Sequence, residues 1–548
     1  NPITFTRDMT FRENYDWANS MCTPKIGDFD NDGINDLWLD GQRQSYSWQT
    51  RTVFAKGLGE RTFQADFEPI METELDSTIV QKTDTIWKTD ESGDFVLDGE
   101  GNKIVEEIIP VVDDEGKPVN DTIVTKNEVY VGTQNGLPQT AWSVGSQPID
   151  FNADGLVDYL ILHPGKVGDL QGYILVKNLG NGKFEVVEDE VLSSIKFSES
   201  PKKGDYNRFN EDNAYTSVVT GDYDKDGYLD LVIAGLDDYE DTDGITDENG
   251  KPVVHHDRRV LYLYKNNKGK GFIRQETPLD GDKPFTGLSR GSVHFADMDN
   301  DGWLDIISSG YGPGEGNLRI YWNNGDGTFS ENGQYLYGSY DSSCFPCDLN
   351  ADGWTDIVVT GYSATKGQNA KSFYVYRNKG GRTFEMLDDL FCGFEGVDGA
   401  TPSFGDVNHD GLPDILAGGH GESHEITTWL YLNRGDFCFK PYGGWYDTES
   451  PWTFNRITHG NNHLIDFDND GYLDAWNMGW AHSDVCSREC AAELYRNTSS
   501  DAGAVSNEAP TAPQNLKAVY DQATKMVTFS WDAASDDVTP QEALQYNL

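Results

Sequence analysis

The sequence predicts an all-β protein of seven four-stranded sheets that close into a β-propeller, followed by part of a C-terminal β-sandwich module. Three observations support this fold class. An Asp-rich pattern of nine residues occurs seven times, a short apolar stretch follows each copy, and the repeats carry no convincing helical periodicity. Aromatic residues make up 12% of the 548-residue chain, so a sizeable core is available despite a formal net charge of −50.

The repeated pattern is D-x-[DN]-x-D-G-x-x-D, and its copies begin 51 to 122 residues apart. The copies are DFDNDGIND (28–36), DFNADGLVD (150–158), DYDKDGYLD (222–230), DMDNDGWLD (297–305), DLNADGWTD (348–356), DVNHDGLPD (406–414) and DFDNDGYLD (466–474). A base period of about 50–60 residues, with insertions early in the chain, fits these gaps and matches the size of a propeller blade.

Two strand signals recur in the repeats. Each Asp-rich copy leads into a short apolar stretch, which we interpret as a buried strand closed by a turn. In five repeats an Asn then precedes a Phe by six residues across a Gly-rich hairpin turn. These pairs are Asn178 and Phe184, Asn266 and Phe272, Asn323 and Phe329, Asn378 and Phe384, and Asn433 and Phe439; Gly57 and Phe63 keep the spacing in the first repeat. Each repeat therefore supplies about four short strands.

The last repeat lacks one strand within its own sequence. Its third strand ends at Asn497, but no Phe follows at the expected distance. The N-terminal segment NPITF contains Phe5, so we expect residues 3–5 to form the outer strand of the last blade. Such a closure joins the two ends of the propeller and removes exposed sheet edges.

The Asp-rich segments have the chemistry of a cation site. Carboxylates occupy positions 1, 3, 5 and 9 (Asn replaces the third in three loops), Gly occupies position 6, and position 7 offers a backbone carbonyl. Such oxygens can converge on one hard cation, as calcium prefers. The loops are not EF-hands, because position 12 already lies in the predicted strand and is never Glu. Asp-Gly turns also occur in hairpins without a metal, but seven full copies favour up to seven calcium ions.

The expected ligands are the side chains of positions 1, 3, 5 and 9 and the backbone carbonyl of position 7. In chain order they are Asp28, Asp30, Asp32, Ile34 and Asp36; Asp150, Asn152, Asp154, Leu156 and Asp158; Asp222, Asp224, Asp226, Tyr228 and Asp230; Asp297, Asp299, Asp301, Trp303 and Asp305; Asp348, Asn350, Asp352, Trp354 and Asp356; Asp406, Asn408, Asp410, Leu412 and Asp414; and Asp466, Asp468, Asp470, Tyr472 and Asp474. Bound ions would offset part of the acidic charge that these loops bring together.

These repeats resemble the FG-GAP (VCBS-type) repeats of integrin α-subunit propellers and of many bacterial surface proteins. The resemblance covers about residues 1–500 and rests on the sevenfold motif. It implies a seven-bladed propeller with calcium held between the first and second strands of each blade. The family's Gly-Asp start of the loop is kept at Gly27, Gly221 and Gly405 and replaced in the other four copies, so those loops can enter at a different angle.

The domain organisation follows from the repeats and from a change in composition. We expect the propeller to span residues 1–497, with a hairpin-like insertion at 69–140 between the first two blades. Residues 498–511 are rich in small residues and Pro, as in a linker. Residues 512–548 alternate like strands and resemble the opening of a fibronectin type III module, as in Bacteroidota surface proteins. That module needs about 90–100 residues, so the parent protein is expected to be longer.

Composition and motifs exclude several classes. The 92 acidic residues against 42 basic ones disfavour binding to nucleic acid or to an anionic membrane surface. No apolar run is long enough for a transmembrane segment. The motifs G-x-S-x-G, H-E-x-x-H and the P-loop are missing from the sequence, so no catalytic residues are predicted and the chain is expected not to be an enzyme.

The seven cysteines give limited information. Cys344 and Cys347 lie in a predicted strand without a second pair nearby, so packed thiols fit better than a zinc or redox site. Cys486 and Cys490 lie in a polar segment and are predicted to form a disulfide. Loops of this calcium-binding type saturate where calcium is millimolar, which predicts an extracellular or cell-surface location.

The longest insertions all fall on the face opposite to the Asp loops, where loops vary and binding residues concentrate. Aromatic residues on that rim, proposed to stack on sugars or form a protein hot spot, include Trp48, Tyr311, Trp445, Trp452 and Trp480; the alternative is that such residues pack between blades. The sequence favours a binding or adhesion module that recognises a glycan or a surface protein. The alternatives are a structural component of an outer-membrane surface or secretion assembly, and a carbohydrate-active enzyme such as a polysaccharide lyase.

Overall fold

The computed structural model of the protein describes a large part of the chain. The described residues are 5–7, 19–20, 25–30, 32–43, 50–59, 62–65, 69–81, 83–87, 105–110, 120–133, 147–163, 172–180, 182–187, 189–194, 217–240, 254–312, 317–331, 334–363, 371–387, 400–420, 426–442, 454–468, 470–482, 487–499, 511, 513–521 and 526–535. The chain divides into two compact units, one formed by Asn1–Phe67 with Thr133–Leu548 and one by Glu68–Gly132. Trp48, Trp445, Trp452 and Cys486 lie outside the described residues.

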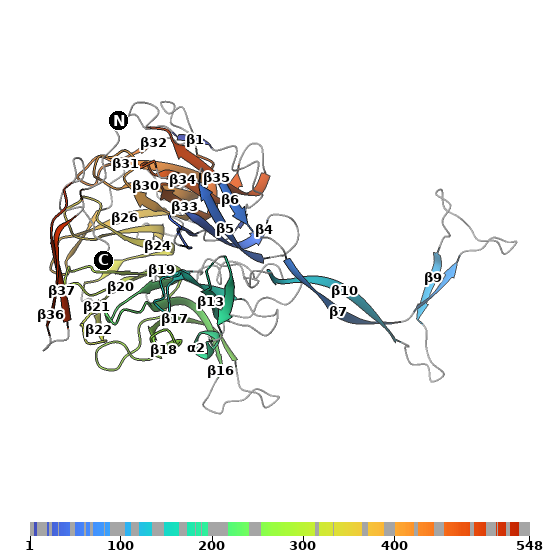
Figure 1. Ribbon diagram of the computed structural model, residues 1–548. Coiled ribbons are helices and arrows are strands. Elements are labelled where there is room, and N and C mark those ends of the chain that lie inside the picture. Colours follow the sequence, from blue (N-terminus) through green and yellow to red (C-terminus); the bar gives the residue numbers. More distant parts are fainter. Residues whose placement is uncertain are drawn as a thin grey trace. The chain divides into compact units, whose positions relative to one another are not determined.

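The first unit is an all-β, seven-bladed propeller (Figure 1), as the repeats predict. Its first three blades are antiparallel sheets of four main strands. Blade 1 contains β3 (Lys25–Gly27), β4 (Asp36–Arg43), β5 (Thr50–Gly59) and β6 (Thr62–Ala65), and β2 (Asn19–Ser20) also pairs with β4. Blade 2 contains β11 (Gln147–Ile149), β12 (Asp158–His163), β13 (Gly172–Asn178) and β14 (Phe184–Val187). Blade 3 contains β15 (Ser217–Gly221), β16 (Asp230–Glu240), β17 (Val254–Asn266) and β18 (Phe272–Gln275).

The next three blades repeat this order. Blade 4 contains β19 (Ser289–Ala296), β20 (Asp305–Tyr311), β21 (Asn317–Asn323) and β22 (Phe329–Glu331), and β23 (Leu336–Tyr337) also pairs with β21. Blade 5 contains β24 (Ser339–Cys347), β25 (Asp356–Ser363), β26 (Lys371–Asn378) and β27 (Phe384–Leu387). Blade 6 contains β29 (Ser403–Gly405), β30 (Asp414–His420), β31 (Ile426–Asn433) and β32 (Phe439–Tyr442).

The seventh blade combines both ends of the propeller. Its strands are β33 (Ile457–Ile465), β34 (Asp474–His482), β35 (Ser487–Asn497) and the N-terminal β1 (Phe5–Arg7), and β28 (Ala400–Thr401) lies parallel to β33. Phe5 lies opposite Asn497, in the register that Phe and Asn have in the other blades. Of the strand predicted at residues 3–5, Phe5 is described and pairs as expected, and the described strand continues to Arg7; residues 3 and 4 lie outside the described residues.

Three further pairs of strands and one helix complete the described structure. In the second unit, β7 (Pro69–Gln81) pairs with β10 (Asn120–Thr133), and β8 (Thr83–Trp87) pairs with β9 (Val105–Pro110). Near the C-terminus, β36 (Gln514–Asp521) and β37 (Met526–Asp532) form an antiparallel ladder; whether a fibronectin type III module begins there stays a prediction. The short helix α2 (Glu190–Ser193) is capped by the Asp189 carboxylate, which also accepts a hydrogen bond from the Phe272 amide, 2.9 Å away.

The core lies between the blades. Seven clusters of buried apolar side chains each join two neighbouring blades, and one of them joins the last blade to the first through Trp476 and Leu37. Between blades 1 and 2 the rings of Trp38 and Tyr159 stack with centroids 3.4 Å apart. Because both faces of a blade are covered, consecutive residues of a second strand are buried rather than alternate ones, as are Leu231, Val232, Ile233 and Ala234 of β16.

Cys344 and Cys347 are packed thiols, as the sequence predicts. Cys344 and Cys347 are free, and burial raises the pKa of both to about 12, so they stay unreactive at neutral pH. The Cys344 amide donates to the Ser292 hydroxyl of blade 4, 2.7 Å away, which ties two inner strands together. Cys490 lies in β35 opposite Trp480; its disulfide with Cys486 stays a prediction.

Candidate metal centres in the seven Asp loops

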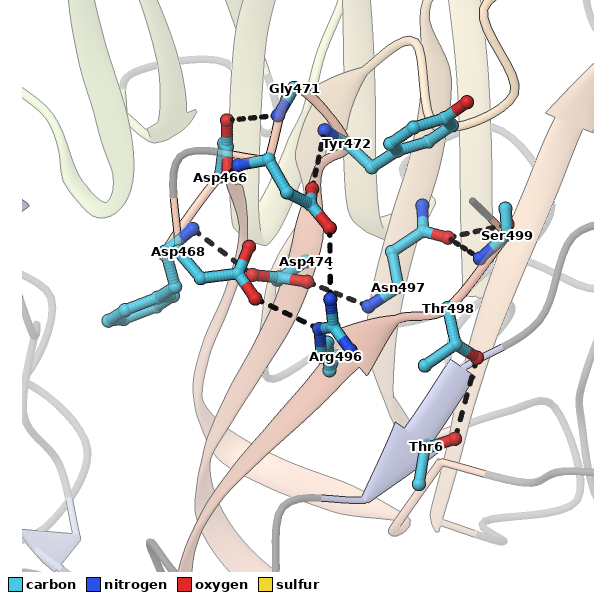
Figure 2. Close-up of polar contacts among 12 residues, drawn as sticks. Thr6, Asp466, Asp468, Gly471, Tyr472, Asp474, Arg496, Asn497, Thr498 and Ser499 are labelled. Carbon is cyan, nitrogen blue, oxygen red and sulfur yellow. Dashed lines mark hydrogen bonds and ion pairs between the residues drawn. The ribbon is translucent and has the colours of Figure 1, made fainter. Parts of the chain in front are cut away.

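Each Asp loop connects the first and second strands of a blade and has the same hydrogen bonds. The carboxylate at position 1 accepts the amides of positions 5 and 6, and that of position 5 accepts the amide of position 7. In blade 7, Asp466 accepts from Gly471 at 2.9 Å, as Figure 2 shows. The Tyr472 amide donates to Asp470 at 3.0 Å. Gly at position 6 has φ of 83–90° in all seven loops, where an L side chain would be strained. The hydrogen bonds within the loop and the Gly at position 6 therefore set the loop geometry.

The carboxylate at position 9 holds the loop to the blade. In all seven loops one oxygen accepts the amide of position 2 and the other accepts an amide of the third strand, at 2.7–3.3 Å. These seven side chains are completely or almost completely buried. Burial raises their pKa, and the two amides only partly oppose this. The pKa is about 6 for Asp36, about 8 for Asp414, and about 7 for Asp158, Asp230, Asp305, Asp356 and Asp474.

Several oxygens in the loops are buried and lack a hydrogen-bond partner among the described residues. At position 3 these are Oδ1 of Asp30, Asp224, Asn408 and Asp468, and at position 5 Oδ2 of Asp226. A buried acceptor without a partner costs free energy unless a cation or water satisfies it. In four loops, three carboxylates place one oxygen each within 4.8 Å of one another. That spacing equals about two calcium–oxygen bonds of 2.3–2.6 Å, so these donor sets fit a hard cation.

The loops differ at position 3. The four carboxylate groups are Asp28, Asp30 and Asp32; Asp222, Asp224 and Asp230; Asp297, Asp299 and Asp305; and Asp466, Asp468 and Asp474. In blades 2 and 5 the position-3 amide is used internally, because Asn152 donates to Asp154 at 3.0 Å and Asn350 donates to Asp352 at 2.8 Å. The backbone N–H of each position-7 residue donates a hydrogen bond to the position-5 carboxylate. The predicted binding of a cation by the position-7 carbonyl stays a prediction.

In blades 2 to 7 a buried Asn at the end of the third strand joins the Asp loop of its blade to the Asp loop of the preceding blade. In blade 4 the Asn323 side chain donates to Leu304 O of its own loop at 3.1 Å and to Tyr223 O of the blade 3 loop at 2.8 Å. Asn178, Asn266, Asn378, Asn433 and Asn497 make the equivalent pairs of bonds. We call these residues the clip asparagines. In the sequence these Asn residues indicate only a hairpin turn, although their recurrence six residues before a Phe could have indicated a shared structural role.

Blade 1 replaces the clip asparagine by another residue. Gly57 stands at the equivalent position, and a Cβ there would lie 2.2 Å from Asn35 O, so no larger side chain fits without movement. The Asn35 side chain instead donates to Asp466 O of blade 7 at 3.0 Å. All seven junctions between neighbouring blades therefore have an amide clip, including the junction that closes the ring.

The structure describes two of the five predicted recognition residues. Tyr311 ends β20 and Trp480 lies near the end of β34; because both strands begin at a position-9 Asp, both residues lie toward the ends away from the Asp loops. Tyr311 is exposed, and the Arg259 guanidinium lies 4.3 Å from its ring centroid. Trp48, Trp445 and Trp452 lie outside the described residues, so a recognition surface shared by the five aromatic residues stays a prediction.

Seven four-stranded blades with an acidic loop in each define the class of protein: a β-propeller with clusters of carboxylates suited to metal ions. A family model described as an FG-GAP-like repeat matches residues 150–233, 297–359, 348–417 and 406–476. These parts of the propeller thus match FG-GAP-like repeats, as the motif resemblance indicated.

Sequence relatives are integrin α chains. Integrin alpha-6 of Homo sapiens is 32% identical over 113 residues, which cover 18% of this chain and 10% of the integrin. Integrin alpha-7 of Rattus norvegicus is 33% identical over 92 residues, covering 16% and 8%, and integrin alpha-IIb of Mus musculus is 32% identical over 95 residues, covering 17% and 9%. The chain thus spans about a tenth or less of these relatives' length.

Among solved structures, the NanB sialidase of Streptococcus pneumoniae aligns over 90% of this chain and 94% of the sialidase, with 11% identity and a TM-score of 0.35. In the part of the chain that the structure describes, no helix is long and apolar enough to cross a membrane.

Proposed function

We propose that this chain is a calcium-stabilised extracellular binding module that recognises a glycan or a surface protein through the loops opposite to the Asp loops. The buried, unpartnered oxygens at position 3 carry the calcium part of the proposal. In blades 3 and 7 their carboxylates converge with those of positions 1 and 9, and in blade 1 with those of positions 1 and 5. In this scheme positions 1, 3, 5 and 9 of each loop hold the ion, and up to seven ions bind. The ions supply the positive charge that the converging carboxylates need.

The recognition part rests on the similarity to integrin α chains and on the position of the aromatic residues. Tyr311 is exposed at the strand end away from the Asp loop, with Arg259 beside its ring, an arrangement that suits stacking on a sugar or a protein side chain. Trp48, Trp445, Trp452 and Trp480 are proposed to extend this surface. The proposal places the protein at the cell surface or outside the cell, where calcium is millimolar.

Removal of calcium tests the first part. A chelator is expected to lower the melting temperature by about 10 °C or more, because each ion stabilises the native state by mass action. Calcium should restore the stability and magnesium should restore it poorly, since magnesium demands a tighter octahedral site. An unchanged melting curve in chelator would refute the calcium assignment.

A matched pair of variants assigns the ions to the loops. Asp301→Asn removes a ligand in blade 4, whereas Asp326→Asn removes an exposed carboxylate of the neighbouring hairpin. By native mass spectrometry, Asp301→Asn should hold one calcium ion fewer at limiting calcium, and Asp326→Asn should hold the wild-type number.

Binding is tested with an immobilised panel of glycans and extracellular proteins. The calcium-loaded chain should retain at least one member, and combined Ala replacement of Tyr311 and Trp480 should weaken that binding while the melting temperature is unchanged. Each aromatic anchor is expected to contribute about 1–3 kcal/mol. Turnover of a polysaccharide instead of retention would favour the enzyme alternative.

A further inference from the structure

A basic residue directly precedes the clip position in five of the seven blades. These residues are Lys56, Lys177, Lys265, Arg377 and Arg496. Each reaches the acidic loop of its own blade. Lys265 bonds to Asp224 and lies 3.5 Å from Asp226, and Arg496 lies 2.9 Å from Asp468 and 3.3 Å from Asp470 (Figure 2). Lys56 likewise pairs with Asp30 and, at 2.7 Å, with Asp32.

These contacts use carboxylates that are proposed to hold the ion. The basic groups contact Oδ2 of Asp30, Asp224 and Asp468, whereas Oδ1 of each is buried without a hydrogen-bond partner among the described residues. In blades 1, 3 and 7 the basic group pairs with the carboxylates of both position 3 and position 5. Lys265 and a divalent cation therefore compete for the same two carboxylates.

Blades 2 and 5 hold their basic group less closely. Lys177 lies 3.4 Å from Asp154 and Arg377 lies 3.6 Å from Asp352, in both cases at position 5 alone. Blade 4 has Trp322 before its clip asparagine, and Arg382 of the blade 5 hairpin reaches Asp299 instead, at 2.7 Å. Arg382 also lies over the Trp322 ring, 4.7 Å from its centroid. Trp322 therefore helps to position Arg382, which takes the place of the basic residue that blade 4 lacks.

Blade 6 has no such group. Leu432 occupies the position before the clip asparagine and is buried in the core between blades 6 and 7. Among the described residues, Asp406 and Asp410 of this loop make no ion pair. Blades 2, 5 and 6 share the same ligand set, with three Asp and one Asn, so they differ mainly in this basic residue. The Asn408 Oδ1 of blade 6 is buried and unpartnered, unlike the internally bonded amides of blades 2 and 5.

We propose that the basic residue before the clip position is a built-in counter-cation that sets the calcium affinity of each loop. Lys56, Lys265 and Arg496 neutralise their loops when calcium is scarce and must be displaced before the ion binds. The blade 6 loop has nothing to displace, so it binds calcium at the lowest concentration. This inference rests on the proposed calcium binding and extends it, because it ranks the loops by residues of this chain that are not ligands.

The ranking is testable loop by loop. Hydrogen exchange of the seven loop peptides, followed by mass spectrometry at increasing calcium, gives the calcium concentration at which each loop becomes protected. In the wild-type chain the blade 6 loop is expected to be protected first. In Lys265→Met the midpoint of the blade 3 loop should fall about two- to fivefold, as expected for loss of one partly exposed ion pair. Midpoints of the other loops should not move.

Two further variants complete the design. Lys283→Met removes an exposed lysine that makes no ion pair among the described residues, and should leave every midpoint unchanged. Arg496→Met should lower the calcium midpoint of the blade 7 loop alone. It replaces Lys265→Met as the test variant if Lys265→Met does not fold. If calcium protects the loops but neither variant shifts its own loop, or blade 6 is not the first to respond, the inference is wrong while the calcium proposal stands. If no loop responds to calcium, the proposed function itself fails.

Discussion

The clip asparagine of blade 4 gives a quantitative prediction about how the blades are held together. Asn323→Ala removes three hydrogen bonds: two from the side-chain amide to Tyr223 O and Leu304 O, and one from the Gly325 amide at 2.9 Å. Asn323 is 2% exposed, so water cannot replace these bonds fully. Each buried polar group left without a partner costs about 1–3 kcal/mol. We expect a total loss of about 3–5 kcal/mol in the free energy of unfolding.

The assay is urea denaturation of the calcium-loaded chain, with the adjacent Asn324→Ala as control. Asn324 is exposed, its bonds to Asp280 and Thr328 face solvent, and its replacement should cost less than about 0.5 kcal/mol. Because Asn323 joins two blades, hydrogen exchange should also rise in the blade 3 loop around Tyr223. A loss below about 1 kcal/mol in Asn323→Ala, or equal losses in the two variants, would show that the clip does not hold the blades together.

Two further predictions concern ring closure and pH. Phe5→Ala should lower the free energy of unfolding by about 3–5 kcal/mol, because this ring is 4% exposed and packs edge-on against Phe454 at 5.5 Å. Thr6→Ala, at an exposed position, should change the melting temperature little. Equal stabilities of the two variants would refute closure by β1. Burial, with a smaller contribution from nearby Lys25, lowers the pKa of His463 to about 3. Since the unfolded imidazole has a pKa of about 6.5, the unfolded state binds the proton first, and stability is lost as pH falls below 6.5 toward 3. His463→Gln should therefore show a smaller drop in melting temperature between pH 7 and pH 4 than the wild type; identical drops would contradict this assignment.

Much of the fold could be predicted because its determinants are local. The short apolar stretches, Gly at position 6 and the Asn–Phe spacing each act within a few residues, so they mark strands and turns directly in the sequence. The ring closure was also predictable, because the last repeat visibly lacked a Phe. The continuation of this strand to Arg7 was not, because it depends on the partner strand: Thr6 and Arg7 pair with Arg496 and Tyr495 of β35.

The clips and counter-cations could not be predicted in the same way. Asn323 bonds to the backbone of Tyr223, 100 residues away, and a backbone carbonyl has no signature in the sequence. Lys265 and Asp224 lie 41 residues apart, and their pairing depends on the twist of a blade. The loop ligands were recognisable from spacing, but the motif does not distinguish Asn152, which donates to Asp154, from Asn408, whose Oδ1 is buried without a hydrogen-bond partner among the described residues.

The closing strand also imposes an order on folding during synthesis. The side chains of Thr6 and Thr498, which come together at the closure, lie 492 residues apart. At about 5–20 residues per second the ribosome needs about half a minute to a minute and a half between these positions. Joining such distant ends costs only about 2 kcal/mol more than joining ends 50 residues apart. Closure thus costs little free energy but comes late in time, because β1 is synthesised before the other blades and its partner β35 is synthesised after them.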